Sequence, residues 1–118
     1  MVNASALDAF GVQAWVAANN IANVNTPGYQ AQRASLTTGP DGRGVEVESI
    51  RRDAAEAPLP ASVEASLSGA AKDAASASNV DLGREMVDLM RTETAYQANA
   101  TVISNQDAIT GSLIDELV

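Results

Sequence analysis

The chain has 118 residues, a length suited to one domain or to one small elongated subunit. Its formal net charge is -8, which makes nucleic acid a poor partner because phosphate binding needs a positive patch. The sequence contains no cysteine and no histidine, which removes disulfide frameworks, thiolate metal sites and the commonest general base. We therefore expect no metal and no cofactor.

Aromatic side chains make up 3% of the residues, and alanine supplies much of the 46% apolar content. Alanine buries little area per residue, so this composition favours close contacts between helices over a thick core. No run approaches the roughly 20 apolar residues of a membrane span. The first basic side chain is Arg33, so we expect no cleavable signal peptide and no membrane insertion.

The first predicted element is a helix over residues 4–24. Its apolar side chains alternate at spacings of three and four, a pattern typical of an a/d seam that pairs with another helix. Trp15 and Val16 lie off this seam, so they either pack on the second helix or contact neighbouring chains. The seam consists of Leu7, Phe10, Ala14, Ala17, Ile21 and Val24.

An asparagine-rich run follows this helix. Asparagine is a poor helix-interior residue because its amide competes for backbone hydrogen bonds. A proline followed by a glycine then supplies the fixed φ and the positive φ that a type II turn needs. The run predicts a helix stop and a tight turn, formed by Asn20, Asn23, Asn25, Thr26, Pro27, Gly28 and Tyr29.

The middle of the chain predicts a β-hairpin and a connector. Residues 29–52 alternate apolar and polar side chains around a turn at residues 39–44, which is typical of a hairpin. Two strands alone are marginally stable, so the hairpin should dock on the helices or on another chain. Residues 53–78 are rich in alanine, serine and acids and include two prolines, which predicts a flexible connector.

The last predicted element is a long helix within residues 79–118, with Asn79 or Asp81 as its N-cap. Its length of about 55 Å, at about 1.5 Å per residue, requires a helical partner. Polar residues interrupt its apolar seam at three positions, including Glu93. The seam consists of Leu82, Met86, Leu89, Tyr96, Ala100, Ile103, Ile114 and Leu117.

Two blocks of this sequence resemble the bacterial flagellar axial proteins, the rod, hook and hook-associated subunits. The first is Ala-Asn-Asn-Ile-Ala-Asn-Val-Asn-Thr-Pro-Gly-Tyr at residues 18–29. The second contains Asn-Val-Asp-Leu at 79–82, Glu-Met-Val at 85–87 and Ala-Tyr-Gln-Ala-Asn at 95–99. Both blocks are in the family's order and little lies between them, so the chain resembles a short member of the flagellar basal-body rod proteins.

The resemblance implies a mainly α fold in which the N- and C-terminal helices pair as an antiparallel coiled coil. The residue patterns divide the chain into a helix and turn (1–28), a hairpin (29–52), a connector (53–78) and a long helix (79–118). The resemblance adds a function to this division. It also implies a structural subunit that self-assembles through the two seams, with the asparagine-rich turn near subunit contacts. Its partners would be itself, other rod or hook subunits and the flagellar export apparatus, in a rod that spans the periplasm and transmits torque.

Other classes of function fit the residues less well. Asp81, Glu85 and Asp88 form a carboxylate cluster, but at helical spacing on a face expected to be solvated, whereas acid/base catalysis needs a shielded pocket. We therefore do not expect an enzyme. A helix that binds anionic membrane carries lysine or arginine, and the first helix has neither. The remaining alternative is a soluble coiled-coil adaptor or an export chaperone that binds a partner helix.

Overall fold

The structure is a computed structural model that describes residues 2–54 and 78–118. It contains, in chain order, the helix α1 (Val2–Ala22), the strand β1 (Gln32–Thr38), a single 3-10 turn (Pro40–Gly42), the strand β2 (Val45–Arg52) and the helix α4 (Leu82–Leu117). The predicted mainly helical fold with one small antiparallel hairpin is confirmed. Most of the connector expected at residues 53–78 lies outside the described residues.

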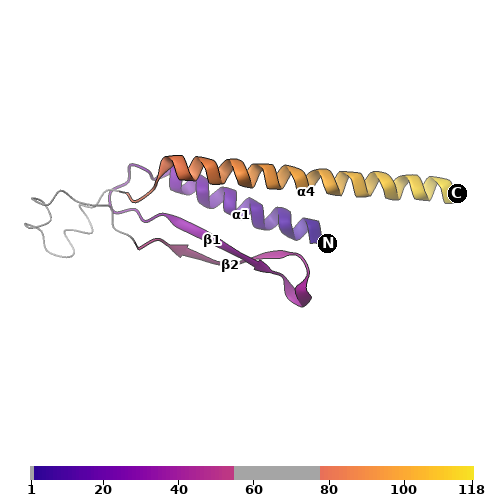
Figure 1. Cartoon of the computed structure of the whole chain (residues 1–118), viewed down its shortest axis with the longest axis horizontal. Coiled ribbons are helices and arrows are strands. Elements are labelled where there is room, and N and C mark those ends of the chain that lie inside the picture. Colours follow the sequence, from indigo (N-terminus) through magenta and orange to yellow (C-terminus); the bar gives the residue numbers. More distant parts are fainter. Residues whose placement is uncertain (1, 55–77) are drawn as a thin grey trace, which may run out of the picture.

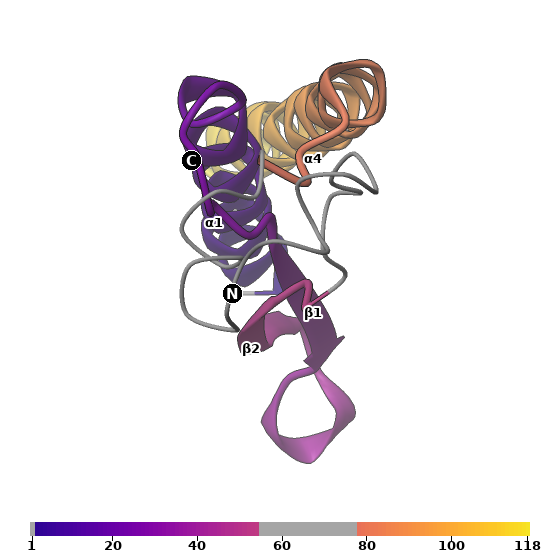
Figure 2. The ribbon, with the colours of Figure 1, turned by 90° about the vertical axis from the view of Figure 1, so that its left-hand side faces the viewer.

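The elements form three layers, with α1 between α4 and the hairpin (Figure 1). Two hydrogen bonds show that α1 and α4 run in opposite directions. Asn20, near the end of α1, contacts Glu85 at the beginning of α4, and Asn3 lies 3.4 Å from Gln106 much further along α4. An end-on view shows the two helices side by side and the hairpin packed on one flank (Figure 2). The molecule is elongated, with Cα extents of 79 × 27 × 13 Å.

The core is thin because small side chains fill it. On α1 the buried residues include Ala6, Ala9 and Ala17, with Val16 beside them. As the middle layer, α1 buries surface against the hairpin as well as against α4, so buried residues extend beyond a single a/d seam. A methyl side chain allows both neighbours to approach closely, at the cost of burying little apolar area.

The first helix ends two residues earlier than predicted, at Ala22. The backbone N–H of Tyr29 then donates to the carbonyl of Thr26 at 3.2 Å, which closes a turn with Pro27 and Gly28 at its centre. Gly28 has a φ of 72°, the positive value that its place in a type II turn requires. The predicted helix stop and tight turn are confirmed.

The hairpin register runs from Gln32 paired with Arg52 to Thr38 paired with Val45. The register shifts by one residue after Ser35, where β2 carries an extra residue, so the ladder contains a β-bulge.

The turn of the hairpin needs glycine at its end. Gly44 has a φ of 72°, and a Cβ placed there would lie 2.4 Å from the Oγ of Ser5 in α1. That Oγ also accepts a hydrogen bond from the backbone N–H of Val45 at 3.2 Å. The hairpin therefore approaches α1 so closely at this point that only glycine fits.

The long helix α4 begins after the second of its two predicted N-cap candidates. Asp81 is its N-cap, and its carboxylate accepts a hydrogen bond from the backbone N–H of Arg84 at 3.1 Å. Beyond Gln106 the helix continues past the beginning of α1, so its C-terminal part extends away from the other layers (Figure 1). Neither of the two described helices is long and apolar enough to cross a bilayer.

Candidate assembly site

Asn20 is the centre of a buried hydrogen-bond network at one end of the molecule. Its exposed fraction is 0%, and all the bonding capacity of its amide is used. Its Nδ2 donates to the Gln32 carbonyl at 2.8 Å and to Glu85 Oε2 at 3.1 Å. Its Oδ1 accepts from the Gln32 N–H at 2.8 Å and from the Tyr29 hydroxyl at 3.0 Å. We call Asn20, Tyr29, Gln32, Arg33 and Glu85 the Asn20 cluster.

The bonds of Asn20 to Gln32 explain how the helix exit leads into the hairpin. The side-chain amide engages both the N–H and the carbonyl of the first residue of β1, as the backbone of a neighbouring strand would. An unpaired buried peptide group costs about 1–3 kcal/mol, so this pairing favours one position for the beginning of β1. The residue that helps to end α1 therefore also positions the strand that follows.

Glu85 is the buried acid of the cluster. It lies in the first turn of α4, where the helix dipole favours a negative charge, and its exposed fraction is 1%. Its second oxygen, Oε1, forms an ion pair with the guanidinium of Arg33, which is partly exposed. The expectation that Glu85 belongs to a solvated acidic face is wrong, because β1 and α1 supply a cation and an amide that compensate its burial.

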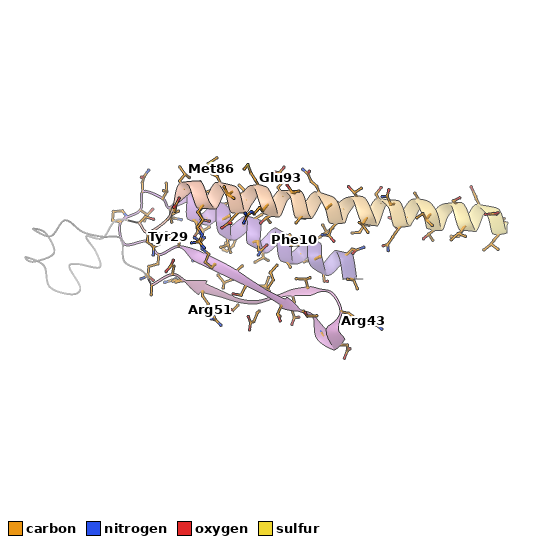
Figure 3. The ribbon with its side chains drawn as sticks, viewed as in Figure 1. Phe10, Tyr29, Arg43, Arg51, Met86 and Glu93 are labelled. Atoms are coloured by element: carbon orange, nitrogen blue, oxygen red, sulfur yellow. The ribbon has the colours of Figure 1, made fainter. Side chains whose placement is uncertain are left out.

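Tyr29 lies between the exit of α1 and the beginning of β1 (Figure 3). Its hydroxyl donates to Asn20, and the amide of Asn19 approaches the same oxygen at 3.5 Å. Burial raises the pKa of Tyr29 above the ordinary tyrosine value, the charge of Arg52 lowers it, and the charge of Glu85 raises it further. The neutral phenol is therefore the form that this environment favours.

Asn79 makes a second junction just before α4. Its Oδ1 accepts from the buried Ala31 N–H at 2.6 Å, its Nδ2 donates to the Asp53 carbonyl at 2.8 Å, and its backbone N–H donates to the Tyr29 carbonyl at 3.2 Å. Asp53 N–H also bonds to the Ala31 carbonyl at 2.7 Å. One asparagine thus joins both ends of the hairpin to the entrance of α4.

The other predicted turn residues lie further out. Asn23 is half-buried, its Nδ2 donates to the Asn19 carbonyl at 2.8 Å, and its Oδ1 accepts from the Thr26 hydroxyl at 3.1 Å. Asn25, Pro27 and Gly28 are exposed. The turn motif therefore combines one buried junction residue with an exposed surface loop.

The predicted seam residues fall into three groups. Leu7, Phe10 and Ala14 of α1 line shallow grooves between the helices together with Leu89 and Tyr96 of α4. A second group is buried or half-buried, and consists of Ala17, Ile21, Val24, Ala100 and Ile103. A third group is exposed in the single chain, and consists of Leu82, Met86, Ile114 and Leu117.

Sequence reasoning missed the polar side chains that α4 buries, Glu85 and Thr92. These two residues are seven positions apart, so they lie on the same face of the helix. This spacing was the feature of the sequence that could have predicted that they share an environment. Thr92 satisfies its hydroxyl by donating to the carbonyl of Asp88 in its own helix at 2.8 Å. No such signal pairs Arg33 with Glu85, because their contact depends on how β1 and α4 are placed around α1.

The geometry of these contacts is that of a structural junction. The carboxylate of Glu85 is engaged by a cation and an amide, and the grooves between the helices are open to solvent. In residues 2–54 and 78–118, no three acidic, histidine or cysteine side chains gather in a way that would hold a metal ion. An elongated helix pair, joined at one end by buried polar contacts and carrying exposed apolar side chains, defines a structural subunit.

Comparisons with known proteins give the same class. Residues 2–30 match the family described as "Flagella basal body rod protein", and residues 72–116 match the one described as "Flagellar basal body rod FlgEFG protein C-terminal". The chain is 33% identical to the flagellar basal-body rod protein FlgC of Borreliella burgdorferi, over 80% of this chain and 79% of that protein. It is 29% identical to the flagellar basal body rod protein FlgB of Bacillus subtilis, over 80% and 75% respectively.

The chain belongs to the flagellar basal-body rod proteins, as the two sequence blocks indicated. It is a structural subunit of the flagellar rod. The Asn20 cluster and Asn79 lie where the two regions matched by these families contact each other in the fold. Characteristic residues of the N-terminal and the C-terminal sequence blocks therefore form one junction.

Proposed function

We propose that this subunit assembles through α1 and α4, which pair as an antiparallel coiled coil in the rod, with copies of itself and with other rod or hook subunits. The assembled axial structure spans the periplasm and transmits torque. The subunit reaches it through the flagellar export apparatus, and it is not an enzyme. The helix and turn at 1–28, the hairpin at 29–52, the connector at 53–78 and the helix at 79–118 act as its four functional segments.

The observation that carries this proposal is the apolar surface that α4 leaves exposed. Large apolar side chains are at least two-fifths exposed along the whole helix, in the part beside α1 and in the part beyond it. Apolar surface of this extent marks interaction sites on soluble proteins. These side chains are Leu82, Met86, Val87, Met90, Tyr96, Val102, Ile109, Leu113, Ile114 and Leu117.

The Asn20 cluster and Asn79 have a defined part in this function. They join the exit of α1, both ends of the hairpin and the entrance of α4. A subunit that transmits torque must pass force between its helices without sliding, and buried directional bonds resist sliding better than alanine contacts do. We propose that this junction holds the two helices in register in the assembled rod.

The experiment is complementation of a strain in which the chain is deleted. Leu7→Asp in α1 and Ile103→Asp in α4 place a charge on the proposed pairing seams, so both should abolish motility and remove the chain from purified basal bodies. Ser104→Asp introduces the same carboxylate on an exposed neighbouring position and should swim normally. Normal motility from either seam variant would contradict the proposal.

Purified basal bodies also separate the proposal from the alternative. A soluble adaptor or export chaperone acts before assembly, so it would remain in the cell fraction even in motile cells. The rod subunit should copurify with the basal body at a fixed ratio to other rod proteins.

A further inference from the structure

The tip of the hairpin contains an aspartate in an unusual backbone conformation. Asp41 has a φ of 59° and a ψ of 22°, in the left-handed region that glycine favours. Within residues 2–54 and 78–118, it is the only residue with a side chain whose φ is positive. Aspartate tolerates this region better than most residues, but the conformation is still unfavourable for a residue with a Cβ. Asp41 is therefore the strained position of the turn.

A glycine follows Asp41, and this order occurs once in the sequence. Every other aspartate is followed by alanine, leucine or glutamate, and no asparagine precedes a glycine. A side chain on the residue after an aspartate hinders attack by the next backbone nitrogen on the aspartyl carboxyl group. Gly42 has no side chain, so this attack meets the least steric hindrance at Asp41.

The surroundings of Asp41 leave its carboxyl group and the following peptide open. Asp41 and Gly42 are exposed, and a Cβ placed on Gly42 would meet nothing within 4 Å. The Asp41 carboxylate makes no hydrogen bond and no ion pair with any of the residues that the structure describes. Arg43 projects from the same tip, outside the helix pair (Figure 3). A five-membered ring at this position would therefore collide with nothing.

Few interactions hold Asp41 in its conformation. The nitrogen of Gly42 has to turn towards Cγ of Asp41 before the two atoms can react, which breaks the hydrogen bond from the Gly42 N–H to the Gly39 carbonyl at 3.2 Å. The Arg43 N–H donates to the Pro40 carbonyl, also at 3.2 Å. Residues 40–43 are exposed, so water can replace these bonds and their net contribution is small. Leaving the left-handed region also relieves the strain at Asp41.

We propose that the Asp41–Gly42 peptide is a site of spontaneous isomerisation to isoaspartate. The Gly42 nitrogen attacks Cγ of the Asp41 carboxylic acid, an N–Cγ bond forms, and the hydroxyl leaves as water with the amide proton. Another water then opens the ring by breaking the bond between the Gly42 nitrogen and the main-chain carbonyl carbon of Asp41. The main chain now runs through Cγ, and the former carbonyl becomes a carboxylate, so composition and charge are unchanged.

The isomerised main chain is longer by one methylene at the point where the turn contacts α1. The turn is closed by a hydrogen bond from the Gly39 N–H to the Gly44 carbonyl at 3.1 Å. A Cβ on Gly44 would lie 2.4 Å from Ser5 Oγ, and the Val45 N–H donates to that Oγ at 3.2 Å. So close a contact leaves no room for a displaced backbone. An isoaspartate at position 41 therefore shifts Gly44 and loosens the hairpin from the beginning of α1.

Tryptic mapping of the full-length protein tests the site. Trypsin cleaves after Arg33 and Arg43, so residues 34–43 are released as one peptide that contains Asp41. The folded protein is incubated at neutral pH and physiological temperature before digestion. We expect a second peptide of identical mass and different retention time, which electron-transfer fragmentation assigns to isoaspartate and which accepts a methyl group from an isoaspartyl methyltransferase.

A synthetic peptide with the sequence of residues 34–43 supplies the reaction rate of the unprotected site. We expect Asp41 in the folded protein to isomerise within tenfold of this rate, because its carboxylate is free and its turn is exposed. A rate in the folded protein more than tenfold below that of the peptide would show that the turn protects Asp41, and would overturn the proposal.

Asp41→Asn and Asp41→Gly are the matched variants. Asparagine tolerates the left-handed region and forms the same ring with loss of ammonia, so Asp41→Asn should react faster than the parent and report each event by a change in mass. Asp41→Gly keeps a residue that favours positive φ and cannot form the ring, so it should give no isoaspartate. Asp107, which precedes an alanine in α4, is the internal control. Equal isoaspartate at positions 41 and 107 would contradict the assignment.

Hydrogen exchange followed by nuclear magnetic resonance tests the effect on α1. The isoaspartyl form is separated from the parent by chromatography. We expect the Val45 amide hydrogen to exchange at least fivefold faster in the isoaspartyl form, since its bond to Ser5 is weakened. The Glu85 amide, which donates to the Asp81 carbonyl at 2.9 Å in α4, is the control and should not change. Unchanged exchange at Val45 would overturn the loosening of α1.

Discussion

Asn20 and Glu85 are 65 residues apart in the sequence and are joined inside the protein by a hydrogen bond of 3.1 Å between Nδ2 and Oε2. This bond links the helix stop at the end of α1 to the first turn of α4. The other hydrogen bonds of Asn20 reach Tyr29 and Gln32, so one side chain connects the helix exit, the turn, the hairpin and the second helix.

Asn20→Asp should destabilise the protein strongly. The change keeps the shape of the side chain but removes both amide donors and places a second carboxylate beside Glu85. We expect the free energy of unfolding to fall by about 3 kcal/mol or more, since a buried acceptor and a buried charge lose their compensation. Urea unfolding followed by circular dichroism measures it. Asn25→Asp, on the exposed turn, should stay within about 0.5 kcal/mol of the parent, and equal losses for the two variants would contradict this account.

The ion pair of Arg33 with Glu85 should show coupling in a double-mutant cycle. Glu85→Gln and Arg33→Gln each break it, and the double variant should lose less than the sum of the two, with a coupling of about 1–3 kcal/mol. The partial exposure of Arg33 places the expected value towards the lower end, because water screens the pair. Glu93→Gln on the exposed side of α4 is the control. Strict additivity of the two changes would show that the pair contributes nothing.

Gly44→Ala should lower the thermal midpoint more than Gly42→Ala does. Both glycines have a positive φ, so both changes carry a similar backbone cost of about 1–2 kcal/mol. Only the alanine at 44 also collides with Ser5 Oγ, whereas position 42 opens onto free space. Adding Ser5→Ala to Gly44→Ala removes the colliding oxygen and should recover part of the loss. If the two glycine variants have the same thermal midpoint, α1 and the hairpin do not approach as closely as described.

Tyr29→Phe should remove part of the pH dependence of stability at alkaline pH. The pKa of Tyr29 is raised in the folded protein, first because of burial, so the folded state holds its proton more tightly than the unfolded state, whose tyrosine pKa is about 10. The resulting stability is fully present below pH about 10 and is lost as the pH rises through the folded pKa.

Unfolding measured between pH 8 and 11 tests this. The parent should lose stability above pH about 10, and Tyr29→Phe should lose less over the same range. At pH 8 the free energy of unfolding of the variant should be lower by about 1 kcal/mol, because Asn20 loses the hydroxyl that donates to its Oδ1. Tyr96→Phe, on an exposed ring, should follow the parent curve. A Tyr29→Phe curve parallel to that of the parent would remove Tyr29 as the origin of the slope.

Local patterns predicted the elements of this fold well. The asparagines with Pro27 and Gly28 predicted a stop and a turn, and the alternation around residues 39–44 predicted a hairpin. Asn79 and Asp81 were the two predicted N-cap candidates of the last helix, and Asp81 is the one that caps it. Each of these features depends on the bonding and dihedral preferences of residues within a few positions of one another. Boundaries were less accurate, since α1 ends at Ala22 although the apolar pattern continues to Val24.

The candidate site was only half predictable. The sequence predicted the turn residues because their order along the chain is distinctive. It placed Glu85 on a solvated face, whereas the side chain is buried. An acidic residue in the first turn of a helix is ordinarily exposed, and no residue near Glu85 in the sequence indicates a partner for its carboxylate. Its burial follows from Arg33 and Asn20, which are brought to it by other elements.

The sequence alone therefore determined the two helices, the turn, the hairpin and the family. Each follows either from the bonding and dihedral preferences of residues close together in the chain or from a distinctive order of residues. The tertiary structure decided which polar groups are buried together, how closely Gly44 approaches Ser5, and which part of α4 extends beyond α1. The reason is physical: compensation of a buried charge and the overlap of two helices depend on where separate segments meet, and a residue's own neighbours along the chain do not fix that.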